Sequence, residues 1–198
     1  HDPTRESLGL LHAMHWPYRQ VASARPVRET PLHARLAAQG ACFGEAAGWE
    51  RANWYAPAGV TPEYEYSYGR QDWFAFTGEE QKAVRERVGL FDLSSFAKFM
   101  LEGRDAEREL QRICANTVAV PVGKIVYTAL LNDHGGIEAD LTVTRLAQDR
   151  YMIVTVAAAQ RHDYAWIRSN LSKGARVVLT DVTSGYAVLS VMGPHSRE

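Results

Sequence analysis

Two short stretches of the sequence alternate polar and apolar side chains, and they include a carboxylate that could take part in chemistry. The polar members are Tyr127, Glu138, Asp140, Thr142 and Thr144. A period of two is typical of a strand whose two faces differ. A carboxylate beside aromatic and apolar surface suits the binding of a polar heterocycle or of a cationic intermediate. Asp140 is therefore the first candidate for a functional residue.

The turn between the two stretches decides which side chains share a face. Asn132-Asp133-His134-Gly135-Gly136 is a strong hairpin signal, because glycine adopts the positive φ that tight turns need. If His134 and Gly135 form the turn, Tyr127 pairs with Thr142; if Gly135 and Gly136 form it, Tyr127 pairs with Thr144. Under either register the polar side chains share one face, whereas a three-residue loop or a bulge would break the assignment. The other face is predicted to be core and holds Val126, Leu130, Ile137, Ala139, Leu141 and Val143.

The polar face has two interpretations. An antiparallel sheet often leaves one face to water, and this produces the same alternation without any function. Ala129 and Leu131 lie on the same predicted face as Tyr127, and a fully solvated face seldom carries such a group of aromatic and apolar side chains. This composition is evidence for a ligand site, although solvent exposure is the more common origin of such a face, and both interpretations stay open on the residues alone.

The elements around the hairpin predict an α+β fold, with helices packed on a mostly antiparallel sheet. Helices are expected over Pro31–Gln39, over Gly78–Val88 with Thr77 as the cap, over Ala106–Ala115 with Asp105 as the cap, and over Ala158–Leu171. Strands are expected over Phe96–Leu101, Ile125–Asn132, Ile137–Arg145, Arg150–Val156, Ala175–Leu179 and Tyr186–Val191. Residues 1–58 differ from the rest in composition, being rich in Trp, His, Arg and Pro. They are expected to form a small, irregular connecting segment before a domain over residues 59–198.

Composition excludes several classes of function. The chain has 198 residues, of which 46% are hydrophobic and 23% charged, with a net charge of −1, so no basic field attracts nucleic acid or an anionic membrane. No apolar run reaches the roughly 18 residues of a membrane span. The two cysteines, Cys42 and Cys114, are expected to be buried free thiols in a reducing compartment. The predicted location is the cytoplasm, or the mitochondrial matrix if the source is eukaryotic.

The other sequence motifs give little evidence of a function. His12 and His15 could share a helix face and bind a metal ion, but no third ligand accompanies them, which favours a packing role. The sequence has no Gly-x-Ser-x-Gly elbow, no phosphate-binding Gly-x-x-x-x-Gly-Lys loop and no Gly-x-Gly-x-x-Gly fingerprint. The chain starts without methionine and stops at Gly193-Pro194-His195-Ser196-Arg197-Glu198, in which the proline after glycine resembles the first turn of a helix. We therefore expect it to be a piece of a longer protein.

Several blocks of the sequence resemble a known family. Residues 121–143, with Gly135-Gly136-Ile137-Glu138-Ala139-Asp140-Leu141-Thr142-Val143 at their end, are similar to the folate-binding domain shared by the glycine-cleavage T-protein and the dimethylglycine and sarcosine dehydrogenases. Residues 87–99 and 163–167 resemble further blocks of that domain. Pro31-Leu32-His33 and Gly48-Trp49-Glu50-Arg51 favour the dehydrogenase branch, in which they resemble the region that joins the flavin domain to the folate domain.

The resemblance implies a two-site enzyme. A flavin domain with FAD, expected outside this chain, would oxidise an N-methyl amine such as sarcosine or dimethylglycine, and the one-carbon unit would pass to tetrahydrofolate to give 5,10-methylenetetrahydrofolate. By the family's strand motif, Asp140 is the catalytic aspartate near the folate nitrogens, Tyr127 is a pterin-side tyrosine and Thr142 lines the pocket. Partners would be the folate and the methylated amine, with no nucleic acid and no membrane; the oligomeric state is left open. The fragment alone would hold part of the folate site and would be inactive.

Two departures and two alternatives accompany the resemblance. T-proteins usually carry paired acids where this chain has Ala139 before Asp140, and often an aromatic residue where it has Thr144. A stand-alone aminomethyltransferase is one alternative, which residues 1–58 disfavour. A non-catalytic regulatory module of the same fold is the other, since related folds include members without chemistry.

Overall fold

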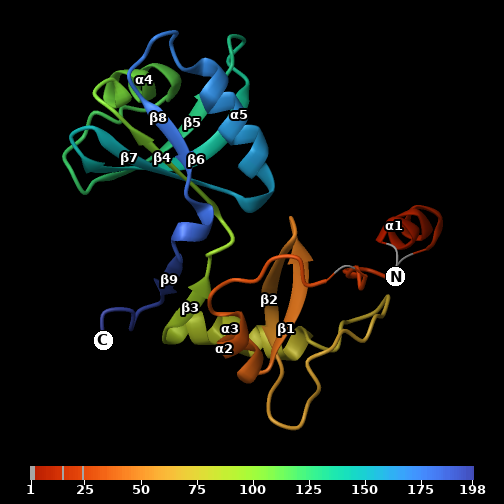
Figure 1. Ribbon diagram of the computed structural model, residues 1–198. Coiled ribbons are helices and arrows are strands. Elements are labelled where there is room, and N and C mark those ends of the chain that lie inside the picture. Colours follow the sequence, from red (N-terminus) through yellow and green to blue (C-terminus); the bar gives the residue numbers. More distant parts are fainter. Residues whose placement is uncertain (1–2, 15, 24) are drawn as a thin grey trace. The chain divides into compact units, whose positions relative to one another are not determined.

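The structure, a computed structural model, describes residues 3–14, 16–23 and 25–198 (Figure 1). The chain forms two compact units. The first contains the described residues up to Ser94 together with Ala187–Glu198, and the second is Ser95–Tyr186. The second unit carries the predicted site residues Tyr127, Asp140 and Thr142.

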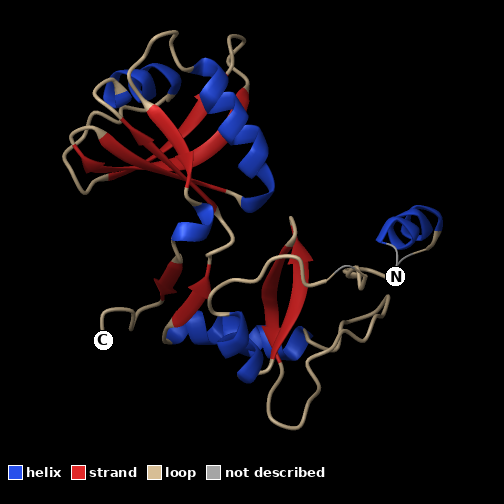
Figure 2. Cartoon of the chain, in the orientation of Figure 1, coloured by secondary structure: helices blue, strands red, loops and turns tan. Residues whose placement is uncertain are grey.

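The second unit is a five-stranded antiparallel sheet in the order β5-β6-β7-β4-β8. Its strands are β4 (Ala97–Glu102), β5 (Ile125–Leu131), β6 (Ile137–Ala147), β7 (Arg150–Thr155) and β8 (Val178–Asp181). Helices α4 (Ala106–Ile113) and α5 (Gln160–Asn170) lie on the same face of this sheet (Figure 2), and short 3₁₀ turns occupy Ala157–Ala159 and Thr183–Gly185.

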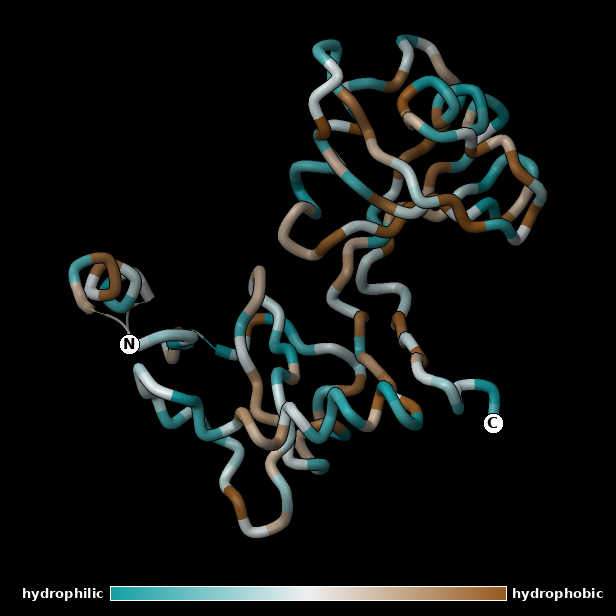
Figure 3. Tube along the Cα trace, turned by 180° about the vertical axis from the view of Figure 1, so that it is seen from behind, coloured by the Kyte–Doolittle hydropathy of each residue, from teal (hydrophilic) through white to brown (hydrophobic). Residues whose placement is uncertain are grey.

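The core of this unit lies between the sheet and the two helices. On α4, Ala106, Leu110 and Ile113 recur at helical spacing and form a buried stripe, which is why this polar sequence folds as an amphipathic helix. Ile167 from α5 joins the same cluster. The strands contribute Ala97, Phe99, Leu101, Val126, Leu130, Ala139, Leu141, Val143, Tyr151 and Ile153. In Figure 3 the strands of this unit carry the brown, hydrophobic stretches of the trace.

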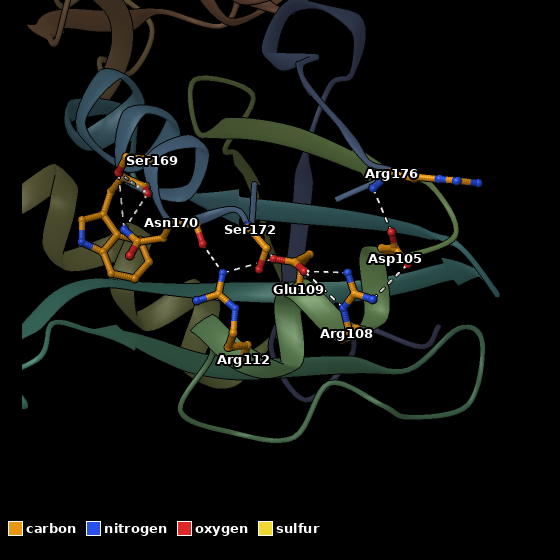
Figure 4. Close-up of polar contacts among 9 residues, drawn as sticks. Asp105, Arg108, Glu109, Arg112, Ser169, Asn170, Ser172 and Arg176 are labelled. Carbon is orange, nitrogen blue, oxygen red and sulfur yellow. Dashed lines mark hydrogen bonds and ion pairs between the residues drawn. The ribbon is translucent and has the colours of Figure 1, made fainter. Parts of the chain in front are cut away.

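A buried carboxylate fastens α4 to the chain that follows α5 (Figure 4). Glu109 is only 1% exposed, and its Oε2 accepts hydrogen bonds from the backbone N–H of Ser172 at 2.8 Å and from the guanidinium of Arg112 at 3.1 Å. Oε1 accepts from Arg108 at 3.1 Å, and Arg112 also donates to the carbonyl of Asn170. Burial by itself would raise the pKa of Glu109, but the hydrogen bonds from Ser172, Arg112 and Arg108 outweigh it and lower that pKa to about 2.

The first unit holds a smaller core. Its elements are α1 (Pro3–His12), α2 (His33–Ala38), the hairpin β1 (Ala41–Ala46) and β2 (Trp49–Tyr55), α3 (Phe74–Glu86), and the antiparallel pair β3 (Gly89–Asp92) and β9 (Leu189–Met192). Cys42, Trp54 and Ala56 form its buried cluster, against which Tyr64, Trp73 and Phe76 pack. Among the described residues, no helix is both long and apolar enough to cross a membrane.

The predicted fold class is confirmed, and most elements lie where the sequence placed them. The expectation of an irregular segment over residues 1–58 is wrong over residues 41–55, where the chain forms the hairpin β1–β2. Ala47 and Gly48 turn it, both with positive φ (53° and 81°), as a two-residue hairpin turn requires. A boundary between domains after residue 58 stays a prediction.

The caps were predicted less well. Thr77 was expected to begin a helix, but α3 starts at Phe74, and the Thr77 hydroxyl donates back to the carbonyls of Trp73 and Phe74 from inside the helix. Asp105 does stand at the cap position of α4, but its carboxylate makes no capping hydrogen bond and instead forms an ion pair with Arg108 of the helix at 3.3 Å. The same carboxylate also accepts the backbone N–H of Arg176 at 2.8 Å.

Candidate functional site

The β5–β6 hairpin contains both a longer loop and a bulge. Tyr127 lies opposite Thr142, as the first of the two predicted registers required. The two-residue turn behind that prediction is wrong, because the N–H of Asn132 donates to the carbonyl of Gly136 and the N–H of Gly135 donates to the carbonyl of Asn132. The loop therefore has three residues, with Gly135 at a φ of 77°. A shift of register between Leu130 and Leu131 restores the pairing of the remaining strand.

The three predicted site residues lie together on the sheet face that the helices leave uncovered. Tyr127 is 64% exposed, and its hydroxyl donates a 2.8 Å hydrogen bond to Oδ2 of Asp140, which is also exposed. Thr142 is half-buried and lies directly opposite Tyr127. The hydrogen bond to Asp140, together with the charge of that carboxylate, raises the pKa of the Tyr127 phenol. The arrangement offers a hydrogen-bonded phenol and a carboxylate to a ligand approaching the open face.

Two residues of the hairpin leave their predicted faces because of the bulge. Ile137, expected in the core, is 72% exposed opposite Leu131. Glu138 was expected beside Asp140, but it has no partner on β5, and its carboxylate contacts Asn132 in the loop and His162 on α5. The other predicted core residues of the hairpin are buried: Val126, Leu130, Ala139, Leu141 and Val143.

The sequence did not single out Lys98, which lies on the same row of the sheet as the candidate site. Thr142 pairs with Val154 and Val154 pairs with Lys98, so the row continues from Tyr127 across four strands. Lys98 is 0% exposed, and its ammonium donates to the carbonyl of Tyr186 at 2.9 Å. The sequence does carry a signal for Lys98, which is a lysine between apolar residues of a predicted strand. A lysine at such a position is buried, and a buried ammonium needs a hydrogen-bond partner.

Neither a metal site nor a disulfide is found in the described part of the chain. No group of three His, Cys, Asp or Glu side chains there could hold a metal ion. His12 ends α1, whereas His15, the second member of the predicted histidine pair, lies outside the described residues. Cys42 and Cys114 are free and buried, as predicted.

Comparisons with known proteins agree on one domain family. The model of the GCVT N-terminal domain matches residues 32–198. Among solved structures, the chain resembles the glycine cleavage system aminomethyltransferase T from Bartonella henselae, with a TM-score of 0.70 and 26% identity over 86% of this chain and 42% of that one.

The curated relatives that the chain matches are longer proteins with several activities. The chain is 50% identical over 195 residues to the 4-methylaminobutanoate oxidase (formaldehyde-forming) of Paenarthrobacter nicotinovorans, covering 98% of this chain and 24% of that protein. It is 34% identical to the mitochondrial pyruvate dehydrogenase phosphatase regulatory subunit of Mus musculus, over 96% of this chain and 22% of the relative. It is 31% identical to the mitochondrial dimethylglycine dehydrogenase of Rattus norvegicus, over 98% and 22%.

The chain thus spans about a quarter of the length of these relatives. The likeness to the T-protein and dehydrogenase branch that the sequence predicted is confirmed. This chain belongs to the family of the GCVT N-terminal domain.

Proposed function

We propose that this chain is the tetrahydrofolate-side domain of a larger FAD-dependent oxidoreductase that acts on an N-methyl amine. The observation that carries the proposal is the hydrogen bond between Tyr127 and Asp140 on the open face of the sheet. The family match and the relatives named as an oxidase and a dehydrogenase of methylated amines support it. No dinucleotide fingerprint occurs in the sequence, so we assign the FAD site to another part of the parent protein.

The chemistry proposed for Asp140 follows from the reaction at the folate. An iminium carbon from the oxidised amine forms two new C–N bonds, one to each reacting nitrogen of tetrahydrofolate, and the bond to the product amine breaks. The two protons lost from the folate nitrogens end on the departing amine, so their transfer needs a nearby base. A carboxylate at this point can orient the folate nitrogen, stabilise the cationic intermediate and relay a proton.

Tyr127 and Thr142 would position the pterin in this proposal. The Tyr127 ring lies exposed beside the carboxylate, where it can contact the flat heterocycle while its hydroxyl orients Asp140. Thr142 offers a hydroxyl on the same face, directly opposite Tyr127. The donor and acceptor groups present therefore suit a polar heterocycle.

The test is Asp140→Asn in the full-length parent protein, with tetrahydrofolate present. We expect amine oxidation to stay within about twofold, whereas formation of 5,10-methylenetetrahydrofolate falls about a hundredfold, the usual size of a lost acid–base group. Asp133→Asn, which removes a charge from the loop of the same hairpin, is the matched control and should leave both rates unchanged. Equal rates in Asp140→Asn and Asp133→Asn would show that Asp140 is only a surface acid.

A second candidate is a regulatory module without chemistry, which the similarity to a phosphatase regulatory subunit favours. The same experiment separates the two. In the regulatory case the parent protein forms no methylenetetrahydrofolate even with Asp140 intact, and a titration calorimeter detects no binding of tetrahydrofolate.

A further inference from the structure

The loop and the core of the β5–β6 hairpin require different strand registers. The three-residue loop places Leu131 opposite Ile137. If that register continued along the hairpin, Thr128 would lie opposite Asp140. Thr128 is 3% exposed on the helix-covered face, and cross-strand partners share a face, so Asp140 would turn into the core and away from the Tyr127 hydroxyl.

The bulge at Glu138 removes this conflict. Beyond it Leu130 pairs with Ala139, which returns Leu141 and Val143 to the core and Asp140 to the open face. A bulge leaves one residue outside the ladder and interrupts its hydrogen bonds. Its position on β6 therefore has to be stabilised by other contacts.

Glu138 itself supplies those contacts, from its carboxylate to two other elements. Oε1 accepts a 2.8 Å hydrogen bond from the side-chain amide of Asn132. The carbonyl oxygen of the same amide accepts the N–H groups of His134 at 3.0 Å and Gly136 at 2.9 Å, so one side chain joins the loop to the bulge. Oε2 lies 3.5 Å from Nε2 of His162 on α5.

The ring of His162 is in turn held in place by a buried carboxylate, that of Asp163. Nδ1 of His162 lies 2.9 Å from Oδ1 of Asp163, which is 1% exposed, and the other oxygen of Asp163 accepts the hydroxyl of Thr155 at 2.5 Å. A continuous series of polar contacts thus runs from β7 through α5 to the bulge. We call the Glu138 carboxylate with its partners Asn132 and His162 the bulge clamp.

We propose that Glu138 is a positioning residue, whose bulge clamp fixes the register of β6 and so holds Asp140 on the open face beside Tyr127. It acts through the backbone two positions before Asp140 and touches no reacting atom. This inference rests on the proposed function only in that the proposed function gives Asp140 its catalytic role. The register itself is a property of the chain alone.

The test compares Glu138→Ala with Asp133→Ala in the 198-residue chain. Asp133 is an exposed acid in the same loop, with no side-chain partner among the described contacts, so it matches the loss of charge without the loss of the clamp. Two readouts are followed by NMR: the titration of the Tyr127 phenol, and amide exchange along Leu130–Asp140. We expect Glu138→Ala to move the Tyr127 midpoint toward the ordinary tyrosine value and to speed exchange at least tenfold, whereas Asp133→Ala changes neither.

Deleting Glu138 provides a second variant that keeps the test decisive if Glu138→Ala does not fold. Without the extra residue the loop register and the core register coincide, so no bulge is needed. We expect the deletion to keep the Tyr127 titration of the wild type. The proposal is overturned if Glu138→Ala behaves as Asp133→Ala does, or if the deletion abolishes the contact between Tyr127 and Asp140.

Binding of tetrahydrofolate to the same variants separates this inference from the proposed function. If the full-length parent protein does not bind folate but Glu138→Ala still changes the Tyr127 titration in the 198-residue chain, the positioning role stands and the function fails. If folate binds and the affinity falls about tenfold in Glu138→Ala alone, both stand.

Discussion

The hydroxyl of Tyr127 reaches Oδ2 of Asp140 at 2.8 Å, although the two residues are diagonal neighbours and not direct partners across the strands. Thr142 lies opposite Tyr127, and Ala129 lies opposite Asp140. Diagonal positions are about 7–8 Å apart at the backbone, so only a long side chain spans them. The hydrogen bond requires the Tyr127 side chain to cross this diagonal, past the small side chain of Ala129 that lies opposite Asp140.

The first prediction concerns the ionisation of Tyr127. The hydrogen bond and the charge of Asp140 raise the pKa of the phenol, so Asp140→Asn should lower the midpoint toward the ordinary value of about 10. The midpoint is read from ¹³C-labelled tyrosine spectra, with the Tyr127 signal assigned from Tyr127→Phe. Thr142→Val, which keeps the carboxylate, is the control and should leave the midpoint in place. A midpoint that is the same in Asp140→Asn and in wild type would refute the contact.

The second prediction concerns the two thiols. Burial raises the pKa of Cys42 to about 11 and that of Cys114 to about 12. Relative to a thiol with a pKa of about 9, the thiolate fraction at pH 8 falls about a hundredfold and a thousandfold, and the thiolate is the reactive form. Maleimide labelling of the folded chain should therefore be slow at both thiols and should become fast for both in urea. Rapid labelling of the folded chain at either position would contradict the burial of that thiol.

Much of the second unit could be predicted because its signals are local. The glycine loop, the period-two alternation of β5 and β6, and the amphipathic stripe of α4 each specify their own element. The same alternation is enough to predict that Tyr127, Asp140 and Thr142 share one face. The hydrogen bond between Tyr127 and Asp140 depends on the strand register. The sequence left two registers open, with Tyr127 opposite Thr142 or opposite Thr144.

The remainder depends on contacts that are distant in sequence. Glu138 was assigned to the wrong face because of the bulge beside the three-residue loop, and its contact with His162, 24 positions away on α5, has no local signal in the sequence. Strand β9 overlaps the strand expected over Tyr186–Val191, but its partner β3 was not expected, because the short run Gly89–Asp92 pairs with a segment far along the chain. Lys98 was overlooked for a related reason, since its partner carbonyl at Tyr186 follows a 3₁₀ turn far along the chain.

The third prediction is a pH dependence of the bulge clamp. The hydrogen bond to Asp163, with the charges of Asp163 and Glu138, raises the pKa of His162, and only the protonated ring can donate from both nitrogens. A raised pKa in the folded state means that the stabilisation is fully present below the unfolded value of about 6.5 and is lost as pH rises through the folded value. His162→Gln should therefore cost more stability at pH 5.5 than at pH 8.5.

Urea unfolding of wild type and variant at the two pH values gives this difference. His134→Gln is the control, because that exposed ring on the same hairpin has no side-chain partner among the described contacts. A cost for His162→Gln that is equal at both pH values, or larger at pH 8.5, would mean that the charged form of His162 does not hold the clamp.

The last prediction concerns the buried carboxylate that joins α4 to the segment after α5. Glu109→Gln keeps the size of the side chain but removes the charge that Arg112 and Arg108 face, so at pH 7 we expect a loss of about 2 kcal/mol, the usual range for charge-assisted hydrogen bonds. The pKa of Glu109 falls from 4.5 to about 2 on folding. A lowered pKa gives stability that is present above the unfolded value and is lost as pH falls through the folded one. The difference in unfolding free energy between wild type and Glu109→Gln, measured in urea, should therefore narrow from pH 7 to pH 3.

The control is Glu102→Gln, which changes an exposed acid on β4 and should alter stability little at either pH. If the difference for Glu109→Gln is as wide at pH 3 as at pH 7, the cost of the substitution comes from packing and not from charge.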